Sequence, residues 1–451
     1  MTTPTTRRLF GTDGVRGEAG RFPLDAATME TIGASLAVRL GAAPLIVIGR
    51  DTRESGEWLE QALIAGALSH GARCESAGVI TTPGVAFLTR SLDAQAGVVI
   101  SASHNPYQDN GVKIFAPTGR KLDDETERLI EADIFAAQDS RPSRPKPELP
   151  TEDHTAELRS RYLAFLQDEI GAGLSLSDQI IVVDAANGAA SHLAPALFEG
   201  LGARVITINT QPDGRNINLN CGSLHIEGLQ QKVVASGATL GVAFDGDADR
   251  SLFVDAHGEY VDGDATLWVL ANNLRARGEL NQNLVVATVM SNIGLEIALR
   301  SRDLKLLRTD VGDKYVLEEL LRTGARLGGE QSGHIIFPSI SLAGDGMITT
   351  LCLLRAMTHE HKPLHALTEG FQRFPQILVN IKVREKRPFT DVPAIRDLAS
   401  KTEAMLGDQG RLLLRYSGTE PLARVMIEGK NQSEIDRYAN DLAEVIREQL
   451  G

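Results

Sequence analysis

Residues 97–115 hold the first side chains that could carry out chemistry. An apolar run, Val98–Ile100, is followed by the hydroxyls of Ser101 and Ser103 and the imidazole of His104. Polar groups after a strand lie where open α/β sheets place their ligands. A serine hydroxyl there becomes a nucleophile when a neighbouring group activates it. A polar surface loop is the more ordinary interpretation, so the other segments of the chain must decide.

Three carboxylates alternate with small residues in a second segment, Asp245-Gly-Asp-Ala-Asp249. Such closely spaced charges repel one another unless a cation neutralises them. An EF-hand loop would place Gly and Glu where this chain has Arg250 and Ala256, so that template fails. A solvated acidic loop is the alternative, but apolar runs flank the segment on both sides. Mg²⁺ is the predicted ion, because it needs few protein ligands besides phosphate oxygens.

A third segment, Arg415–Arg424, carries two arginines, two hydroxyls and a glycine around a turn. Guanidinium forks and hydroxyl donors suit a phosphate dianion, whereas an exposed turn between strands is the alternative. The segment Glu330–His334 offers a carboxylate and a hydroxyl to sugar hydroxyls or an amine, and Asp313 adds an acid/base group or merely begins a helix. The segment Phe10–Gly17 is glycine-rich and suits an anion or a plain turn.

Alternating strands and helices must position these segments. The first series comprises a helix over 26–40, a strand over 45–48, a helix over 55–70 and a strand near 78–80. The pattern restarts with strands at 180–183 and 240–244, and again at 284–287 and 325–327. Such alternation predicts doubly wound α/β domains with mainly parallel sheets.

The C-terminal part has a different pattern. Strands are predicted over 377–383, 412–416 and 425–428, with helices over 392–406 and after a capping Ser433, which indicates a small antiparallel α+β domain. A proline-rich stretch over 141–150 indicates a connection, and a helix over 156–170 follows it. We therefore expect three related α/β domains, 1–154, 155–255 and 256–369, and an α+β domain, 370–451.

The composition excludes several classes of protein. A net charge of −13 argues against nucleic-acid or anionic-membrane binding. Three scattered cysteines fit a reducing compartment better than a disulfide framework. No apolar region follows Arg7-Arg8, and no apolar run approaches the ~20 residues that a membrane helix needs. We expect a cytoplasmic protein that binds neither nucleic acid nor membrane.

The chain resembles the α-D-phosphohexomutase superfamily along essentially its whole length. The resemblance rests on FGTDGVRG at 10–17, ISASHNPYQDNGVKIF at 100–115, DGDADR at 245–250, GEQSGH at 329–334 and RYSGTEPLAR at 415–424. Gln331, Asp313, the stretch Pro212–Asn218 and Cys221-Gly222 resemble the glucosamine subgroup. Glucose and mannose enzymes tend to have a second Glu in place of Gln331.

The resemblance implies four domains around a central cleft and a role for each motif. Ser103, rather than Ser101, would carry a phosphoryl group that activity requires. One Mg²⁺ per chain would be held by Asp245, Asp247, Asp249 and an oxygen on Ser103. Glu330 and Ser332 would contact the sugar. The non-reacting phosphate would be held by Arg415, Ser417, Gly418, Thr419 and Arg424, and the transferring phosphoryl group would lie near Arg16, His104, Lys113 and Arg250.

The implied reaction moves a phosphoryl group between O6 and O1 of glucosamine phosphate, with a hexose 1,6-bisphosphate as intermediate or primer. Its product would supply UDP-N-acetylglucosamine and cell-wall synthesis. The general base is Lys113 or Asp313, and both remain open. Glucose or mannose phosphates are the alternative substrates; a non-catalytic sugar-phosphate sensor and a serine phosphatase are the alternative functions. The resemblance also implies a homodimer.

Overall fold

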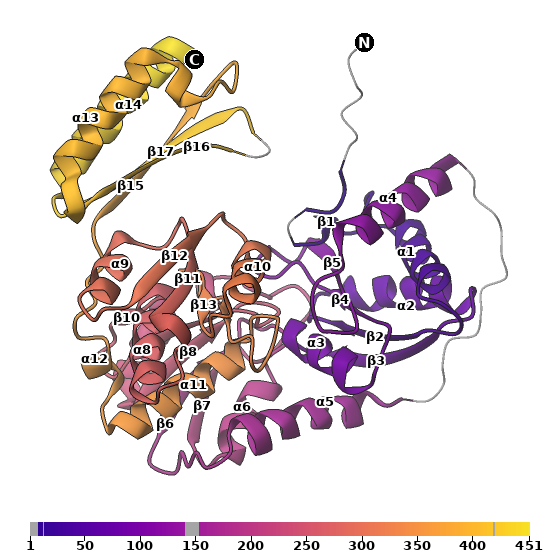
Figure 1. Cartoon of the computed structure of the whole chain (residues 1–451). Coiled ribbons are helices and arrows are strands. Elements are labelled where there is room, and N and C mark those ends of the chain that lie inside the picture. The colour runs from indigo at the N-terminus through magenta and orange to yellow at the C-terminus, as the bar shows by residue number, and fades with distance from the viewer. Residues whose placement is uncertain (1–7, 12, 140–152, 418–419) are drawn as a thin grey trace. The chain divides into compact units, whose positions relative to one another are not determined.

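The computed structural model describes residues 8–11, 13–139, 153–417 and 420–451. These residues form two compact units (Figure 1). The larger unit comprises Met1–Val289 and Leu307–Glu369, and the smaller comprises Met290–Leu306 and Gly370–Gly451. The predicted connection over 141–150 lies outside the described residues, and the four domain boundaries remain predictions. Among the described residues, no helix is long and apolar enough to cross a membrane.

The first sheet of the larger unit has the strand order β1-β5-β4-β2-β3. β2 pairs in parallel with β3 and β4, whereas β5 runs antiparallel to β4 and β1. The sheet is therefore mixed rather than mainly parallel, because a short polar loop, not a crossover helix, joins β4 to β5. The strands are β1 (Val15–Glu18), β2 (Leu45–Arg50), β3 (Arg73–Val79), β4 (Ala96–Ile100) and β5 (Asp109–Phe115).

Helices cover both faces of this sheet, as the prediction of a doubly wound domain requires. Ile46 and Ile48 of β2 join a core with α1 (Ala26–Arg39), α2 (Gly56–Leu68) and α4 (Asp124–Asp139). On the opposite face, side chains of α3 (Thr82–Ser91) close over Gly97 of β4. The sequence analysis missed α3, although Thr81 at its N-cap and a proline in its first turn are helix-start signals.

The second sheet repeats this order as β10-β9-β8-β6-β7. β6 again pairs in parallel with two neighbours, and β9 again returns antiparallel to β8. Its strands are β6 (Ile180–Asp184), β7 (Arg204–Ile208), β8 (Leu240–Phe244), β9 (Ser251–Asp255) and β10 (Tyr260–Val261). The accompanying helices are α5 (Thr155–Ala164), which continues as a π-helical segment (Phe165–Ile170), α6 (Leu193–Gly200) and α7 (Glu227–Ser236).

The third sheet has the order β12-β11-β13-β14. As in the first two sheets, a parallel pair, β11 and β13, is followed by a strand that runs antiparallel, β14. Its strands are β11 (Leu284–Thr288), β12 (Lys305–Thr309), β13 (Gly328–Gly329) and β14 (Ile335–Ile336). The strand predicted at 325–327 is wrong in position, since β13 begins at Gly328. The helices of this part of the larger unit are α8 (Gly263–Ala276), α10 (Asp313–Thr323), α11 (Gly346–Glu360) and α12 (Leu364–Leu367). The repeated strand order confirms three related α/β units.

The smaller unit is an antiparallel sheet with two helices against one face (Figure 1). Its strand order is β15-β17-β16, and the elements are β15 (Gln376–Lys382), α13 (Pro393–Leu406), β16 (Arg411–Tyr416), β17 (Leu422–Glu428) and α14 (Gln432–Leu450). The predicted α+β class is confirmed. The predicted cap at Ser433 is wrong: Asn431 caps α14, because its side chain accepts from the backbone N–H groups of Ser433 and Glu434.

The smaller unit also contains α9 (Ile293–Arg300), which the sequence analysis assigned to the third α/β domain. Glu428 of β17 is fully buried and accepts a hydrogen bond from the backbone N–H of Ile293 at 3.0 Å. The same carboxylate pairs with Arg411 at 2.9 Å. This buried, charge-assisted pairing ties the start of α9 to the antiparallel sheet.

One buried hydrogen bond joins helices of the second and third repeats. Tyr162 of α5 is fully buried, and its hydroxyl donates to Oδ2 of Asp345 at 2.6 Å. The other oxygen of Asp345 accepts from the backbone N–H groups of Met347 and Ile348, which caps α11. Burial raises the pKa of Asp345 to about 6 despite these donors. Tyr162 therefore supplies a partner that water cannot replace.

We predict that Tyr162→Phe lowers the free energy of unfolding by about 1–3 kcal/mol, because it leaves a buried carboxylate oxygen without its donor. The measurement is the urea unfolding transition followed by circular dichroism. Tyr315→Phe is the matched control, since Tyr315 is 37% exposed. Equal losses in the two variants would contradict a special role for the Tyr162–Asp345 bond.

Candidate active site

The loop after β4 presents Ser103 to the acidic segment of the second repeat. Ser103 has a φ of 52°, in the left-handed region that non-glycine residues seldom adopt. Its backbone N–H donates to the hydroxyl of Ser101 at 2.9 Å, and that hydroxyl donates to Asp51 at 2.6 Å. The Ser103 hydroxyl instead donates to Asp245 at 2.5 Å. Ser101 therefore holds the loop, while the hydroxyl of Ser103 faces the carboxylates.

Arg53 fixes the shape of this loop, a role that the sequence analysis missed. Its buried guanidinium pairs with Asp51 at 2.8 Å. The same group donates to the backbone carbonyl oxygens of Ser103 at 3.0 Å, Asn105 at 2.8 Å, Asp109 at 2.9 Å and Pro106. The signal in the sequence is Gly49-Arg-Asp-Thr-Arg53, a charged run directly after the strand predicted at 45–48.

The second repeat holds the same loop from the other side. The side-chain amide of Asn218 donates to the carbonyl oxygens of Ser103 at 2.9 Å and Asn105 at 3.1 Å. A Cβ added to Gly246 would lie 2.5 Å from the carbonyl oxygen of Ser103, so only glycine allows this approach. The first and second repeats are therefore fitted closely to each other at Ser103.

Asp245, Asp247 and Asp249 are all buried in the loop after β8, and their ligand oxygens lie within 4.8 Å of one another. Burial, with the charges of Asp249 and Asp247, raises the pKa of Asp245 well above its usual range. The Oδ1 atoms of Asp247 and Asp249 are buried without a hydrogen-bond partner among the described residues. Unused hard oxygens and excess negative charge fit the predicted Mg²⁺.

Lys113 of β5 lies among these carboxylates. Its ammonium is buried and lies 2.9 Å from Asp247 and 3.2 Å from both Asp249 and Asp13. Burial acts to lower the pKa of Lys113, but the surrounding carboxylates, Asp13 foremost, hold it well above its usual range. Thr82, at the start of α3, donates to the same oxygen of Asp247 at 2.6 Å. Lys113 is therefore a fixed positive charge in this arrangement.

The third repeat contributes Asp313 at the start of α10 and the Glu330–His334 segment between β13 and β14. The imidazole of His334 lies 3.7 Å from Asp249 and 3.8 Å from Asp313. Burial acts to lower the pKa of His334, but Asp249 and Asp313 raise it to about 9. Glu330 accepts from the backbone N–H of Gly312 at 3.2 Å, and Ser332 donates to Glu330 at 3.4 Å.

The N-terminal glycine-rich segment brings Arg16 to the Ser103 loop, because Arg16 of β1 pairs with Gly111 of β5. The guanidinium of Arg16 contacts Asp13 and donates to the side chain of Asn105 at 3.4 Å. Asp13 also pairs with Lys121 at 2.6 Å, and Lys121 pairs with Asp313 at 2.7 Å. The sequence analysis assigned no role to Asp13 or Lys121, which connect the first and third repeats.

His104 and Arg250 complete this group. Arg250 lies 3.3 Å from Nδ1 of His104, and the same nitrogen lies 3.3 Å from the Ser103 hydroxyl. Burial, together with the positive charges of Arg250 and Arg16, lowers the pKa of His104 to about 4. The imidazole is therefore neutral near pH 7 in this structure, and its Nδ1 atom can accept from Arg250 beside the Ser103 hydroxyl.

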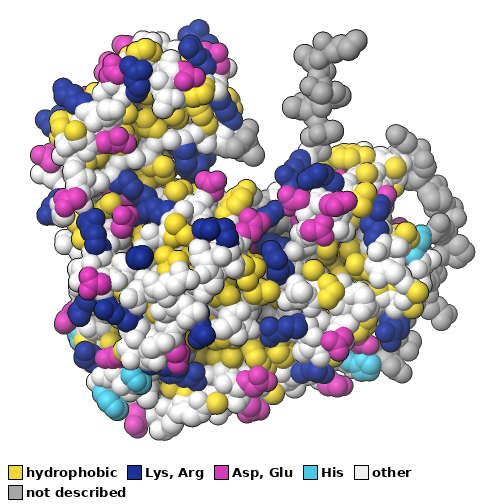
Figure 2. Space-filling view, in the orientation of Figure 1, with side chains coloured by type: hydrophobic (Ala, Val, Ile, Leu, Met, Phe, Trp, Pro, Cys, Tyr) yellow, Lys and Arg dark blue, Asp and Glu magenta, His cyan; other side chains and the backbone are white. Residues whose placement is uncertain are grey.

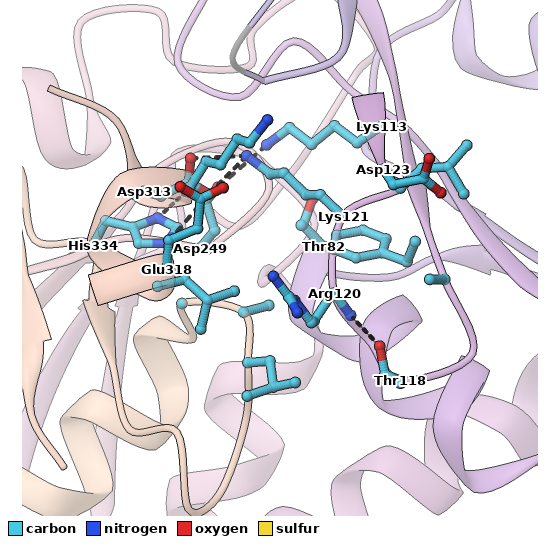
Figure 3. A pocket seen from close by; sticks show the side chains of 18 of the residues that line it. Thr82, Lys113, Thr118, Arg120, Lys121, Asp123, Asp249, Asp313, Glu318 and His334 are labelled. Atoms are coloured by element: carbon cyan, nitrogen blue, oxygen red, sulfur yellow. Dashed lines mark hydrogen bonds and ion pairs between the residues drawn. The ribbon is translucent and has the colours of Figure 1, made fainter. Parts of the chain in front are cut away.

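Two neighbouring cavities open onto these residues. One of about 450 Å³ has six predicted site residues in its lining, Arg16, His104, Asp249, Arg250, Asp313 and Glu330. The second, of about 340 Å³, is shown in Figure 3, where Lys113, Lys121, Asp249, Asp313 and His334 converge at one end and Arg120 lies at the other. The first cavity has the size of a small-molecule site. On the face that Figure 2 shows, acidic and basic side chains of the larger unit are interspersed.

The smaller unit carries the predicted phosphate-binding segment between β16 and β17. Arg415 and Arg424 are paired opposite each other in the two strands. Burial and the charge of Arg424 lower the pKa of Arg415. The guanidinium of Arg424 lies 3.5 Å from the hydroxyl of Ser417. Gly418 and Thr419 lie outside the described residues. Two facing guanidinium groups with a hydroxyl fit a dianion.

Comparisons with known proteins place the chain in a family. The four domains of the phosphoglucomutase/phosphomannomutase family match in order: the alpha/beta/alpha domains I, II and III match residues 7–141, 160–258 and 262–374, and the C-terminal domain matches residues 378–445. The chain belongs to the phosphoglucomutase/phosphomannomutase family. The predicted superfamily and four-domain organisation are therefore confirmed.

Within this family the chain is similar to phosphoglucosamine mutases. The enzyme of that name from Solibacter usitatus is 49% identical over 447 residues, which cover 98% of this chain and 99% of the relative. The one from Citrifermentans bemidjiense is 46% identical over 448 residues, 99% of each chain. A solved structure of a phosphoglucomutase/phosphomannomutase family protein from Burkholderia thailandensis has a TM-score of 0.79 at 24% identity and covers 98% of this chain and 97% of that one, which supports the fold.

We predict that Arg53→Lys lowers kcat for mutase turnover on the order of 100-fold. Lysine keeps the charge but lacks the planar guanidinium that donates to four carbonyl oxygens, so the loop that carries Ser103 is expected to shift. The measurement is steady-state kinetics with circular dichroism to verify folding. Arg50→Lys is the matched control, since the Arg50 guanidinium pairs with Glu60 at 2.9 Å and, among the described residues, holds no carbonyl oxygen of the Ser103 loop. Wild-type kcat in Arg53→Lys would contradict the positioning role.

Proposed function

We propose that this protein interconverts glucosamine 6-phosphate and glucosamine 1-phosphate, the reaction of a phosphoglucosamine mutase. The observation that carries the proposal is the Ser103 hydroxyl, held 2.5 Å from Asp245 in a buried cluster of three carboxylates. Whole-length identity of 49% to a curated enzyme of that name supports the same conclusion. Phosphoglucomutase or phosphomannomutase activity with the same chemistry is the second candidate.

The reaction begins with a phosphoryl group on Ser103. The free O1 hydroxyl of glucosamine 6-phosphate attacks phosphorus, loses its proton to a general base, and the bond from phosphorus to the Ser103 oxygen breaks. The product is the 1,6-bisphosphate. The bisphosphate then reorients so that its 6-phosphate faces Ser103. The Ser103 oxygen attacks the phosphorus on O6, and the bond from O6 to phosphorus breaks as O6 takes up a proton. Glucosamine 1-phosphate leaves, and the phosphoserine is restored.

Fixed charge accounts for most of the catalysis in a transfer of this kind. Asp245, Asp247 and Asp249, with a phosphoryl oxygen on Ser103, would hold Mg²⁺, which neutralises negative charge on the transferring group when bound. Lys113, Arg16 and Arg250 add positive charge from the chain itself. The neutral imidazole of His104 is within reach of the Ser103 oxygen, at 3.3 Å.

We assign the general base to Asp313 rather than Lys113. Asp313 lines the 450 Å³ cavity, whereas Lys113 does not. Lys113 is surrounded by three carboxylates and carries a raised pKa, so it has no free electron pair to accept the sugar proton. Asp313 is held in place by Lys121 at 2.7 Å. Lys113 then acts as an electrostatic group.

The remaining contacts are proposed for binding. Glu330 and Ser332 would bind the C2 amine and the adjacent hydroxyl of the sugar, since a carboxylate accepts from an ammonium group strongly. Arg415, Ser417 and Arg424, with Gly418 and Thr419, would hold the phosphate that is not being transferred. One phosphate clamp must serve both orientations of the sugar, because O1 and O6 exchange roles between the two steps.

We predict that Ser103→Ala abolishes turnover while circular dichroism and sugar-phosphate binding stay close to wild type. Mass spectrometry of the wild-type protein should find one phosphate, on the peptide that contains Ser103. The control is Ser101→Ala, which removes the neighbouring hydroxyl and its bond to Asp51. Because this variant keeps the Ser103 hydroxyl, its Ser103 peptide should still carry the phosphate. Turnover by Ser103→Ala, or phosphate on Ser101, would refute the assignment of Ser103.

We predict that kcat/KM is highest for glucosamine 6-phosphate, by roughly tenfold or more over glucose 6-phosphate and mannose 6-phosphate, because only the amino sugar offers a cation to Glu330. Coupled assays with the three sugar phosphates make the comparison. Glu330→Gln should lower kcat/KM for glucosamine 6-phosphate and so reduce its advantage over glucose 6-phosphate and mannose 6-phosphate. A higher value for glucose or mannose would favour the second candidate, and release of inorganic phosphate without isomer formation would indicate a phosphatase.

A further inference from the structure

A second group of metal-ligating side chains lies outside the residues of the active site. It consists of Asp255 at the end of β9, His257 in the turn before β10, and His365 in α12. One ligand atom from each lies within 4.8 Å of the others. The two imidazole rings are 4.3 Å apart between centroids and inclined at 35°. None of the three lines either cavity described above.

The side that carries Asp255 and His257 is held rigidly. Asp255 is 2% exposed, and its Oδ1 accepts from the backbone N–H groups of His257 at 2.8 Å and Glu259 at 3.0 Å. Gln230 of α7 donates to the carbonyl oxygen of Gly258 at 2.7 Å, which fastens the turn. The second oxygen of Asp255 takes no part in these bonds. A carboxylate oriented by backbone donors is a prepared ligand.

The opposite side is held by the surroundings of α12. Leu364 is buried, and the indole of Trp268 donates to the carbonyl oxygen of Glu369 at 3.3 Å. His365 is half-buried, and its Nδ1 atom is inaccessible to water and has no hydrogen-bond partner among the described residues. Buried polar atoms are nearly always paired. A metal ion bound through Nδ1 of His365, together with His257 and Asp255, would supply the missing partner.

We propose that Asp255, His257 and His365 form a second metal site, for Zn²⁺ or a similar late first-row divalent ion. Two imidazoles and a carboxylate are a common donor set for such ions and leave one position for water. Mg²⁺ prefers oxygen ligands only, so it is expected in the aspartate cluster and not here. His257 is exposed, which gives the ion a path from solvent.

The proposed site bridges two elements of the larger unit. It joins the second sheet, through β9 and its turn, to α12 of the larger unit. α12 ends at Leu367, and the C-terminal segment of the smaller unit begins at Gly370. Bound metal therefore fixes the last helix before the chain leaves the larger unit. The inference does not depend on the proposed reaction.

The test is isothermal titration of ZnCl₂ into the full-length protein without a histidine tag, in excess Mg²⁺ so that the aspartate cluster is occupied. Wild type is expected to bind one Zn²⁺ per chain and to melt at a higher temperature when Zn²⁺ is present. His257→Ala and His365→Ala should each weaken binding by roughly tenfold or more and lose the rise in melting temperature. His225→Ala is the control, since His225 is an exposed histidine in the same unit, and it should bind as wild type does.

Two outcomes would overturn the proposal: wild type that binds no Zn²⁺ under these conditions, or binding that persists unchanged in both His257→Ala and His365→Ala. Circular dichroism of the two variants shows whether they are folded. His257→Ala is the safer variant in this respect, because its side chain is exposed. Mg²⁺-dependent mutase activity should be the same in both variants and wild type, which separates this site from the active site.

Discussion

The structure depends on a balance of buried charge at the junction of the three α/β repeats. The second repeat places Asp245, Asp247 and Asp249 in one buried loop, and the first repeat adds Asp13. Lys113 of β5 lies 2.9 to 3.2 Å from three of these carboxylates, those of Asp247, Asp249 and Asp13. A buried charge without a partner is far costlier than one that is paired. The repeats must therefore meet in one arrangement, in which the three aspartates form a cluster suited to a metal ion.

That arrangement is maintained by groups that do no chemistry themselves. Arg53 donates hydrogen bonds to four carbonyl oxygens of the Ser103 loop. Asn218, which belongs to the second repeat, donates to two of the same oxygens. Ser103 is thereby kept at a positive φ, a backbone state that persists only where its surroundings enforce it. The rigidity of the loop is what allows a single hydroxyl to meet the acidic cluster.

The repeated topology explains why one loop from each repeat reaches the same region. In the first two sheets a central strand lies between two parallel neighbours, and the next strand returns antiparallel. The loop at that reversal holds Ser103 in the first repeat and the aspartates in the second, and in the third it holds Glu330 and His334 between β13 and β14. A short reversal leaves side chains at the sheet edge, where they can face a ligand.

The sequence by itself indicated the candidate chemistry: a serine and three aspartates that each follow an apolar run, and an arginine pair around a turn. It also determined the three repeats and the α+β class of the C-terminal domain. Only the tertiary structure decided the roles of Arg53, Asn218 and Lys121. The loop carbonyl oxygens that Arg53 and Asn218 hold, and the carboxylate of Asp313 that Lys121 contacts, lie 50 or more residues away in the sequence. Hydrophobic periodicity reports local geometry, whereas such contacts depend on how the sheets are ordered and packed. For the same reason the short strand β13 was misplaced and the mixed sheet was not foreseen.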